Sequence, residues 1–366
     1  MTSAACATSR SRSDGVGCGG VGFDGPDAIG MDVDLHLHTQ RRAWQAMGTD
    51  AEVLITGYLA SSDPQASAPF NELADLAVQR VELLESSWSR FRRDSELSEL
   101  NRHAGRGPFA ASADLMELIE RMQDAWRWTA GACDANVHDA MSSLGYDRDF
   151  AMIQGPHGRE ETRTLTPAQW QVNEATMGDV VVDRVAGTVH LPHGMRLDPG
   201  AIGKGLAADI VCRELAAAGA AGALVNLGGD ISAVGLGAPD QGWRIAVLDE
   251  RIAPEAKDRQ HCALTIDHGP FGVATSTTLR RRWSVGGRTV HHVLDPRTGQ
   301  PVDSDLVQVT VVAPTGWQAE AAATAAMILG AEQGPNWLAQ RELFACVLTS
   351  QSSRIVRGER NVHVDS

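Results

Sequence analysis

The chain has 366 residues and carries 32 basic against 46 acidic side chains, a formal net charge of −14. This balance excludes binding of DNA or RNA through a basic surface, so any anionic ligand must be held by a few local groups. No apolar run approaches the roughly 18 residues of a membrane-spanning helix, and we expect no transmembrane segment. The six cysteines are scattered without a CxxC pair, which is typical of free thiols rather than of a zinc site or a disulfide framework.

The first forty residues differ in composition from the rest of the chain. Residues 1–30 are rich in Gly, Ser, Ala and Asp and contain no apolar stretch of the kind that a secretory signal needs. We therefore predict a disordered extension over residues 1–41, a folded domain over 42–350 and a polar tail over 351–366. Because no export signal is visible, the expected location is the cytoplasm.

Apolar residues recur with helical spacing in two stretches of the N-terminal half. Leu73, Leu76, Ala77, Leu84 and Trp88 fall on one face of a helix over 70–88, and a second amphipathic helix is predicted over 113–129. The other expected helices cover 202–215 and 317–329. Strands are expected at 47–57, 180–182, 188–191, 222–227, 231–236, 243–248, 288–294, 306–313 and 344–349. Helices and strands mix without a regular βαβ rhythm, which favours an α+β fold over a doubly wound parallel sheet.

A glycine-rich turn, Asp198-Pro-Gly-Ala-Ile-Gly-Lys-Gly205, comes directly before one of the predicted helices. Its glycines allow a ligand to approach the backbone closely, and a helix N-terminus beside Lys204 is a natural phosphate site. It does not match the Walker A pattern. When the segment is taken alone, a plain loop-to-helix turn is the favoured interpretation.

Two other glycine turns have structural explanations of their own. The segment Asn226–Asp230 (NLGGD) follows an apolar strand, where paired glycines fit either a hairpin or the approach of a ligand. The segment Thr129–Asp134 (TAGACD) ends the helix predicted at 113–129, and a C-cap glycine would by itself explain Gly131.

The segment His291–Gly299 (HHVLDPRTG) places two histidines before a turn. Neighbouring residues of a strand point to opposite faces, so only one histidine can face a given site. His292 could act as a general base because imidazole titrates near neutral pH. A lone histidine on a strand is more often structural.

A carboxylate and a hydroxyl lie four residues apart on the alanine-rich helix, at Glu320 and Thr324. This spacing puts both on one helix face, and their oxygens suit Mg²⁺. A surface glutamate on an ordinary helix is the simpler interpretation of Glu320 alone. The basic run Arg280–Trp283 is similarly ambiguous, and we expect its arginines to face solvent and Trp283 to pack in the core.

Taken in order, these segments resemble the ApbE family, the FAD:protein FMN transferases. Eight motifs occur in the family's order over residues 45–350, nearly all of the expected folded domain. They are MGT (47–49), SRFRRDSELSELN (89–101), TAGACD (129–134), LDPGAIGKGLAAD (197–209), NLGGD (226–230), VATST (273–277), HHVLDPRTG (291–299) and AEAAATAAMILG (319–330).

The resemblance implies a fold of mixed or antiparallel sheets with packed helices, and a defined reaction. The family uses Mg²⁺ to cleave FAD, transfers FMN to a threonine or serine hydroxyl of an acceptor flavoprotein, and releases AMP. By the same resemblance, His292 would lie beside the reacting phosphate, while the Ala201 carbonyl, Glu320 and Thr324 would bind the metal. The residues implied to contact FAD are Met47, Phe91, Ala132, Cys133, Asp134, Asp198, Lys204, Asn226, Gly228, Gly229, Asp230 and Thr275.

The sequence departs from the family pattern in four places, which comprise five residues. Glu320 replaces the usual aspartate of the metal motif, and Phe91 replaces a tyrosine, which keeps ring stacking but removes a hydroxyl. Cys133 replaces an aromatic residue, and Thr277-Thr278 replaces a Gly-Asp pair.

Three alternative functions remain open from the sequence. The same site could hydrolyse FAD to FMN and AMP with water as the acceptor. A flavin-binding module without turnover is a second alternative, although it would need neither a metal site nor a base. A structural protein that has lost the activity is the third.

Overall fold

The computed structural model describes residues 36–59, 67–154, 175–237, 242–253, 255–256, 258–358 and 362–365. The chain divides into two units, Met1–Asp34 and Leu35–Ser366, and all described residues belong to the second. Of the extension predicted to be disordered over residues 1–41, residues 1–35 lie outside the described residues. Within the described part of the chain, no helix has the length and apolar character needed to cross a membrane.

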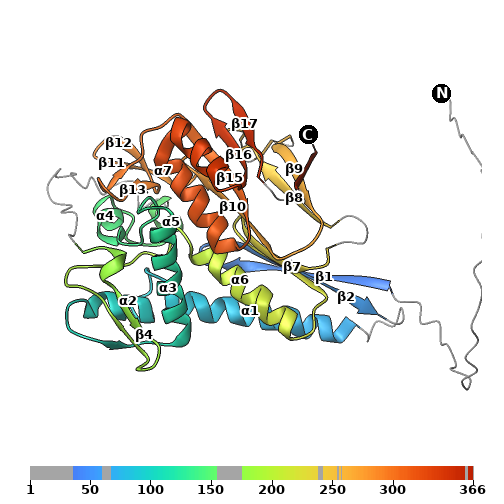
Figure 1. Cartoon of the computed structure of the whole chain (residues 1–366), viewed down its shortest axis with the longest axis horizontal. Helices are drawn as coiled ribbons and strands as arrows, with labels where there is room; N and C mark the ends of the chain where they lie inside the picture. The colour runs from blue at the N-terminus through green and yellow to red at the C-terminus, as the bar shows by residue number, and fades with distance from the viewer. Residues whose placement is uncertain are drawn as a thin grey trace, which may run out of the picture. The chain divides into compact units, whose positions relative to one another are not determined.

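An eight-stranded antiparallel sheet forms the centre of the second unit (Figure 1). Its strands run in the order β1-β2-β6-β7-β10-β15-β16-β17, and each neighbouring pair is antiparallel. Their bounds are β1 His36–Ala46, β2 Thr49–Leu59, β6 Gly222–Leu227, β7 Asp230–Gly235, β10 Phe271–Thr277, β15 Leu306–Ala313, β16 Phe344–Thr349 and β17 Ser353–Val356. Strands β6 and β15 are buried along almost their whole length, because both faces of the sheet are covered.

Three helices cover one face of this sheet: α1 Ala68–Trp88, α6 Gly203–Ala217 and α7 Gly316–Gln340. Helices α6 and α7 approach closely at Gly205 and Gly316, where a Cβ atom on either residue would collide with the backbone of the other. The carboxylate of Asp209 in α6 accepts hydrogen bonds from the backbone N–H groups of Gly316 (2.7 Å) and Trp317 (3.0 Å). The N-terminus of α7 is therefore fixed to α6, and both helix starts lie at the same place.

A three-stranded sheet covers the other face, in the order β18-β9-β8. Its strands are β8 Trp243–Leu248, β9 Gln260–Ile266 and β18 Val362–Asp365. Ile245 and Leu264 from this small sheet pack with Phe271 and Val273 of β10 in one buried cluster. The main sheet is thus a middle layer between helices and a second sheet.

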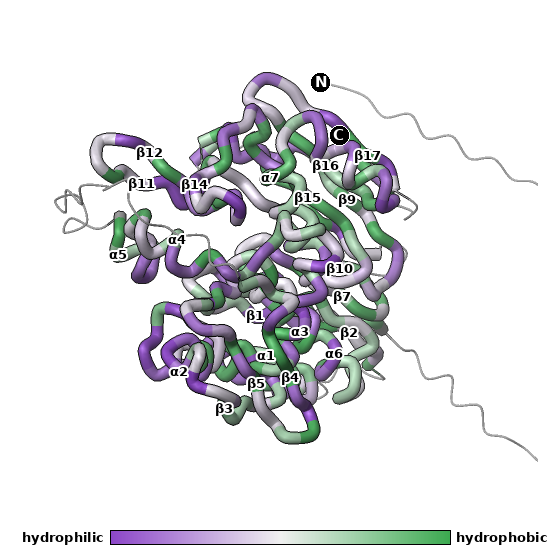
Figure 2. The backbone as a smooth tube through the Cα atoms, turned by 60° about the vertical axis from the view of Figure 1, so that its left-hand side comes forward, coloured by the Kyte–Doolittle hydropathy of each residue, from purple (hydrophilic) through white to green (hydrophobic). Residues whose placement is uncertain are grey.

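Smaller elements complete the unit around the main sheet. They are α2 Glu96–His103, β3 Phe109–Ala110, α3 Ala113–Trp128, α4 His138–Ser143, α5 Phe150–Gln154, a 3-10 turn at Met177–Asp179, β4 Val181–Asp183, β5 Thr188–His190, β11 Arg282–Val285, β12 Arg288–His291, β13 Leu294–Asp295 and β14 Gln300–Pro301. Figure 2 shows hydrophobic stretches along the strands of the main sheet and hydrophilic ones along α2.

The predicted α+β class is confirmed, with antiparallel sheets and packed helices. The helices predicted at 70–88, 113–129 and 202–215 correspond to α1, α3 and α6, and the strands predicted at 222–227, 306–313 and 344–349 correspond to β6, β15 and β16. After α3, the first left-handed position is Ala130 with a φ of 52°, and Gly131 follows it with a φ of 83° and donates its N–H to the Trp126 carbonyl at 2.8 Å. The cap therefore includes Gly131, but its first left-handed residue is an alanine. The alanine-rich helix is confirmed up to Gly330, where the backbone is non-helical before a second helical segment.

Several details of the prediction are corrected by the structure. The strand expected at 288–294 is broken into β12 and β13, because the chain turns at His292. Leu76, which was placed on the buried face of the first helix, is 39% exposed. Strand β1 starts at His36, ahead of the boundary drawn at residue 42, and the expected polar tail contains β17 and β18, which pair with β16 and β9.

Candidate functional site

One cavity of about 1380 Å³ opens where the N-termini of α6 and α7 face the turn between β6 and β7. Its walls collect nearly all the residues that the sequence nominated. Those lining it are Met47, Phe91, Ala132, Asp134, Asp198, Ala201, Lys204, Asn226, Gly228, Gly229, Asp230, Thr275, His292, Glu320 and Thr324. Cys133 is the exception, because its side chain is buried in the core and does not line the cavity.

The cavity exists because two strands of the main sheet part from one another. Strand β10 pairs with β7 only from Phe271 to Val273, whereas it pairs with β15 from Gly272 to Thr277. The edge of β10 at Thr275–Thr277 therefore faces the cavity instead of β7. On the opposite side, the β6–β7 turn closes through Gly228 and Gly229, with φ angles of 68° and 97°. The hairpin and the ligand-approach interpretations of NLGGD are thus compatible.

The loop before α6 is held by a buried ion pair between Arg90 and Asp198. Arg90 Nε lies 2.9 Å from Asp198 Oδ2, and the two side chains are only 6% and 5% exposed. The other carboxylate oxygen of Asp198 accepts a hydrogen bond from the Gly200 N–H at 2.8 Å. The Arg90 guanidinium also lies over the rings of Phe91 and Tyr146, at 4.2 and 4.5 Å from their centroids. Sequence reasoning missed Arg90, although it lies beside Phe91 in a recognised motif.

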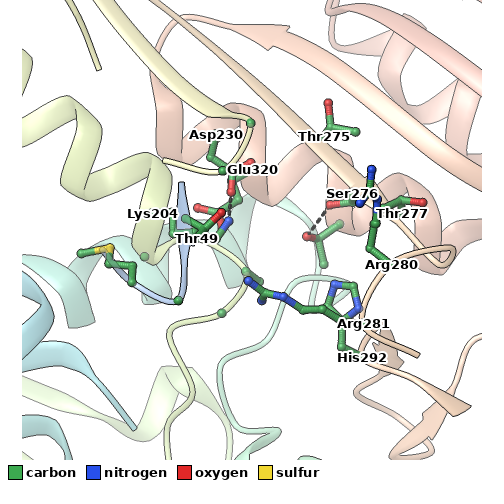
Figure 3. Close-up of a pocket in the computed structure, with 18 of the residues that line it drawn as sticks. Thr49, Lys204, Asp230, Thr275, Ser276, Thr277, Arg280, Arg281, His292 and Glu320 are labelled. Carbon is green, nitrogen blue, oxygen red and sulfur yellow. Dashed lines mark hydrogen bonds and ion pairs between the residues drawn. The ribbon is translucent and has the colours of Figure 1, made fainter. Parts of the chain in front are cut away.

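A second charged group joins α6, α7 and the β6–β7 turn (Figure 3). Lys204 Nζ lies 3.3 Å from Glu320 Oε1 and forms an ion pair with Asp230. Glu320 Oε2 also accepts a hydrogen bond from the Gly205 N–H at 2.8 Å. Burial lowers the pKa of Lys204, and its contact with Glu320 partly offsets that shift.

Oxygen atoms dominate the wall next to Glu320. The Thr324 hydroxyl on α7 lies 3.2 Å from the Ser276 hydroxyl on β10, and Ala201 lines the cavity in the loop before α6. Among the described residues, no group of three His, Cys, Asp or Glu side chains is placed to hold a metal ion. A metal here would therefore rely on mixed oxygen donors rather than on a cluster of acidic and imidazole ligands.

The side chains of His291 and His292 face different surroundings, as their neighbouring positions in the sequence predict. His291 Nε2 lies 3.2 Å from the carbonyl oxygen of Val302, while His292 lines the cavity. His292 Nδ1 is buried and has no hydrogen-bond partner within the described structure. Burial lowers the pKa of His292 to about 3, and the charges of Arg281 and Lys204 add to the shift. The imidazole is therefore neutral near pH 7 in the protein without ligands.

The far wall is aromatic and partly acidic. Phe91 packs on Tyr146 with a ring-centroid distance of 5.6 Å. Met47, which has a left-handed φ of 51°, also lines the cavity. Burial raises the pKa of Asp134. This wall offers flat apolar contacts, which suit an aromatic ring system.

The basic run at Arg280–Trp283 differs from our expectation. Trp283 packs in a buried aromatic cluster and donates its Nε1–H to the Leu144 carbonyl at 2.7 Å, as predicted. The three arginines, however, line the cavity instead of facing only solvent. Arg280 forms an ion pair with Glu250.

Residues 47–348 match the model of the ApbE family. The chain belongs to this family. It is 31% identical to the FAD:protein FMN transferase of Salmonella typhimurium over 67% of each chain, and 31% identical to that of Treponema pallidum over 80% of this chain and 79% of the relative. It also shares its fold with the crystal structure of the ApbE protein from Thermotoga maritima, with a TM-score of 0.71, 22% identity, and coverage of 88% of this chain and 97% of that one. The resemblance inferred from the eight motifs is confirmed.

As a member of the ApbE family, the chain accommodates its departure at Glu320 without removing the carboxylate from the site. The longer side chain remains in the cavity wall and is held from both sides, by Lys204 and by the Gly205 N–H. The departure at Phe91 keeps an aromatic ring in the wall.

Proposed function

We propose that the protein transfers FMN from FAD to a threonine or serine hydroxyl of an acceptor flavoprotein and releases AMP. The observation that carries this proposal is the position of the His292 imidazole, whose Nδ1 atom has no hydrogen-bond partner within the described structure, in the same cavity as Lys204, Glu320 and Thr324. A base, a cation and oxygen donors for a metal are the groups that phosphoryl transfer to a hydroxyl needs. The named relatives of the chain supply the donor and the class of acceptor.

We assign different parts of the dinucleotide to different walls of the cavity. Its aromatic wall, with Phe91 and Met47, suits a flat ring. The β6–β7 turn brings glycine backbone to the cavity, where N–H groups can approach phosphate oxygens. We assign phosphate binding to Lys204 and the start of α6, where helix dipole and ammonium charge act together. This local arrangement explains how a chain of net charge −14 can hold an anion.

The donor set fits Mg²⁺ by its chemistry. Glu320 offers a carboxylate, Thr324 a hydroxyl and Ala201 a backbone carbonyl, and Mg²⁺ prefers such oxygens together with water and phosphate. When bound, the ion would neutralise charge on the phosphate oxygens. We propose these three residues as its protein ligands.

The protein groups perform the proton transfer. His292 takes the proton from the acceptor hydroxyl as that oxygen attacks the phosphorus atom of the FMN phosphate. A new bond forms between the acceptor oxygen and phosphorus, and the bond from phosphorus to the bridging oxygen breaks. AMP leaves with the electron pair of that bond. Lys204 stabilises the charge that develops on the phosphate.

The test is to incubate the protein with FAD, Mg²⁺ and a flavoprotein domain that carries an acceptor threonine. Flavin fluorescence on the acceptor band of a denaturing gel, with AMP in equal amount, is the expected result. If AMP and free FMN appear without a labelled acceptor, the protein hydrolyses FAD instead of transferring FMN. Bound FAD that stays intact with Mg²⁺ would indicate a flavin-binding module.

A further inference from the structure

We propose that Arg281 binds the FMN phosphate that is transferred, as a second catalytic residue beside His292. This inference rests on the proposed function and deepens it. It concerns the middle residue of the run Arg280–Arg282, which the sequence alone suggested to be solvent-facing.

The backbone sets Arg281 apart from its neighbours. Its φ of 43° lies in the left-handed region, which is costly for a residue with a long side chain. Such strain persists only where the surrounding structure fixes it, and it is concentrated at functional sites. Figure 3 shows the Arg281 side chain next to the His292 ring and extending into the cavity.

The charge of Arg281 is not balanced by the protein. Six other cationic side chains of the cavity wall pair with carboxylates: Arg90 with Asp198, Arg92 with Asp94, Arg148 with Asp147, Lys204 with Glu320, and Arg259 and Arg280 with Glu250. Arg282 also lines the cavity without an ion pair in the described structure, but it is exposed, whereas Arg281 is half-buried. Arg281 forms no ion pair with any residue that the structure describes. A guanidinium in a cavity without a carboxylate partner is a site for an anion from the ligand.

The pKa values of two neighbouring groups indicate where the charge of Arg281 acts. Arg281 contributes to lowering the pKa of both His292 and Lys204. Its guanidinium is therefore within electrostatic range of the proposed base and of the proposed phosphate-binding lysine. The three groups face one space, and an anion placed there would be stabilised by all of them.

The chemistry of arginine suits this position. Its planar fork of N–H donors matches two phosphate oxygens at once, which a lysine cannot do. A donor aimed at the reacting phosphate also stabilises charge that grows during the transfer. Arg281 should thus influence both binding of the phosphate and the rate of transfer.

The chain supplies a control in Arg288. This residue is exposed, lies on β12 outside the cavity wall, has no ion pair within the described structure and has no left-handed backbone. Arg288→Met and Arg281→Met therefore remove the same charge from outside and from inside the cavity. Arg281→Gly relaxes the left-handed backbone and serves as a second variant if Arg281→Met does not fold.

The first measurement compares FMN with riboflavin, which lacks the phosphate, by flavin fluorescence titration without added metal. We expect Arg281→Met to weaken FMN binding by about tenfold or more, since a hydrogen bond to a charged group is removed, and to leave riboflavin binding unchanged. Arg288→Met should alter neither affinity. Equal weakening of both ligands, or no change for FMN, would overturn the assignment.

The second measurement is the rate of FMN transfer to the acceptor at saturating FAD and Mg²⁺. We expect kcat to fall by about 10²–10³-fold in Arg281→Met, with partial recovery in Arg281→Lys. If the unmodified protein transfers FMN and Arg281→Met matches it, the role of Arg281 is wrong while the proposed function holds. If the unmodified protein neither binds flavins nor cleaves FAD, the proposed function fails and this inference fails with it.

Discussion

Lys204 Nζ lies 3.3 Å from Glu320 Oε1, so the residue assigned to the phosphates contacts the residue assigned to the metal. Lys204 lies in the first turn of α6, and Glu320 is the fifth residue of α7. In the protein without ligands, Lys204 pairs with two carboxylates, those of Glu320 and Asp230. A metal ion at Glu320 must therefore compete with the ammonium group.

The carboxylate of Glu320 gives the first prediction. Glu320→Gln keeps the shape of the side chain but removes its charge, so the Mg²⁺ concentration that gives half-maximal FAD cleavage should rise by about tenfold or more. Glu320→Asp retains the carboxylate and should keep a Mg²⁺ dependence close to that of the unmodified protein. A Mg²⁺ titration that is the same for Glu320→Gln would remove Glu320 from the metal site.

The protonation state of His292 gives the second prediction. The pKa of His292 in the folded protein without ligand is lowered to about 3 from an ordinary value of 6.5, so the ring should stay neutral while the pH falls from 7 to 5. NMR of protein labelled at its histidine rings can follow this, with His292→Asn to assign the signal. A His292 signal that titrates near pH 6.5 would contradict the burial and the neighbouring charges that the structure shows.

The same shift has a consequence for stability. Between the folded pKa and the unfolded pKa, the unfolded chain binds the proton of His292 and the folded chain does not, so stability falls as the pH drops below 6.5. His292→Asn should flatten this part of the dependence of the free energy of unfolding on pH. Urea unfolding at pH 7.0 and 5.5 measures it, and identical slopes for both proteins would be inconsistent with a lowered pKa.

The cap that Asp209 forms on α7 gives the third prediction. Asp209→Ala removes both acceptors of the Gly316 and Trp317 N–H groups, and it should lower the free energy of unfolding by about 1–2 kcal/mol. Because α7 carries Glu320 and Thr324, the affinity for Mg²⁺ should fall as well. Asp209→Asn keeps one acceptor and should lie between the two proteins in urea unfolding. Unchanged stability in Asp209→Ala would show that water replaces the cap.

The buried pair of Arg90 and Asp198 gives the fourth. Arg90→Met leaves the Asp198 carboxylate without its partner at 5% exposure, and it should cost about 3 kcal/mol of stability. The double variant Arg90→Met/Asp198→Asn removes the unpaired charge and should recover part of the loss. If the double variant loses more free energy of unfolding than the two single variants lose together, that result would argue against a direct pairing.

Most residues nominated from the sequence line one cavity, because their motifs end strands or begin helices. Lys204 follows a glycine turn at a helix start, and Glu320 and Thr324 share a helix face, so local spacing made them candidates. The order of the eight motifs, through their resemblance to the family, then favoured the functional over the structural interpretation. Arg90 was missed because its role depends on Asp198, which lies more than a hundred residues away and has no local signal. Arg281 was misjudged because the direction of its side chain follows from a left-handed φ that sequence patterns do not reveal for arginine.

The fold was predictable from the sequence to a similar extent. Where the prediction of strands failed, the reasons were related. Strand β6 has a strong apolar pattern and was found, whereas β9 and β10 mix small and polar residues and were not. The strand expected at 288–294 failed because the chain turns at His292, which places that ring in the cavity. Burial of Cys133 could not be read from a motif in which the family has a larger aromatic residue.

The central claim is that this cavity moves FMN from FAD to a hydroxyl with His292 as the base. Its most direct test is the intact mass of an acceptor flavoprotein after incubation with FAD, Mg²⁺ and either the unmodified protein or His292→Asn. We predict that the unmodified protein adds one FMN per acceptor with one AMP released, and that His292→Asn still binds FAD but adds none. An acceptor of unchanged mass with the unmodified protein, or full transfer by His292→Asn, would contradict the account.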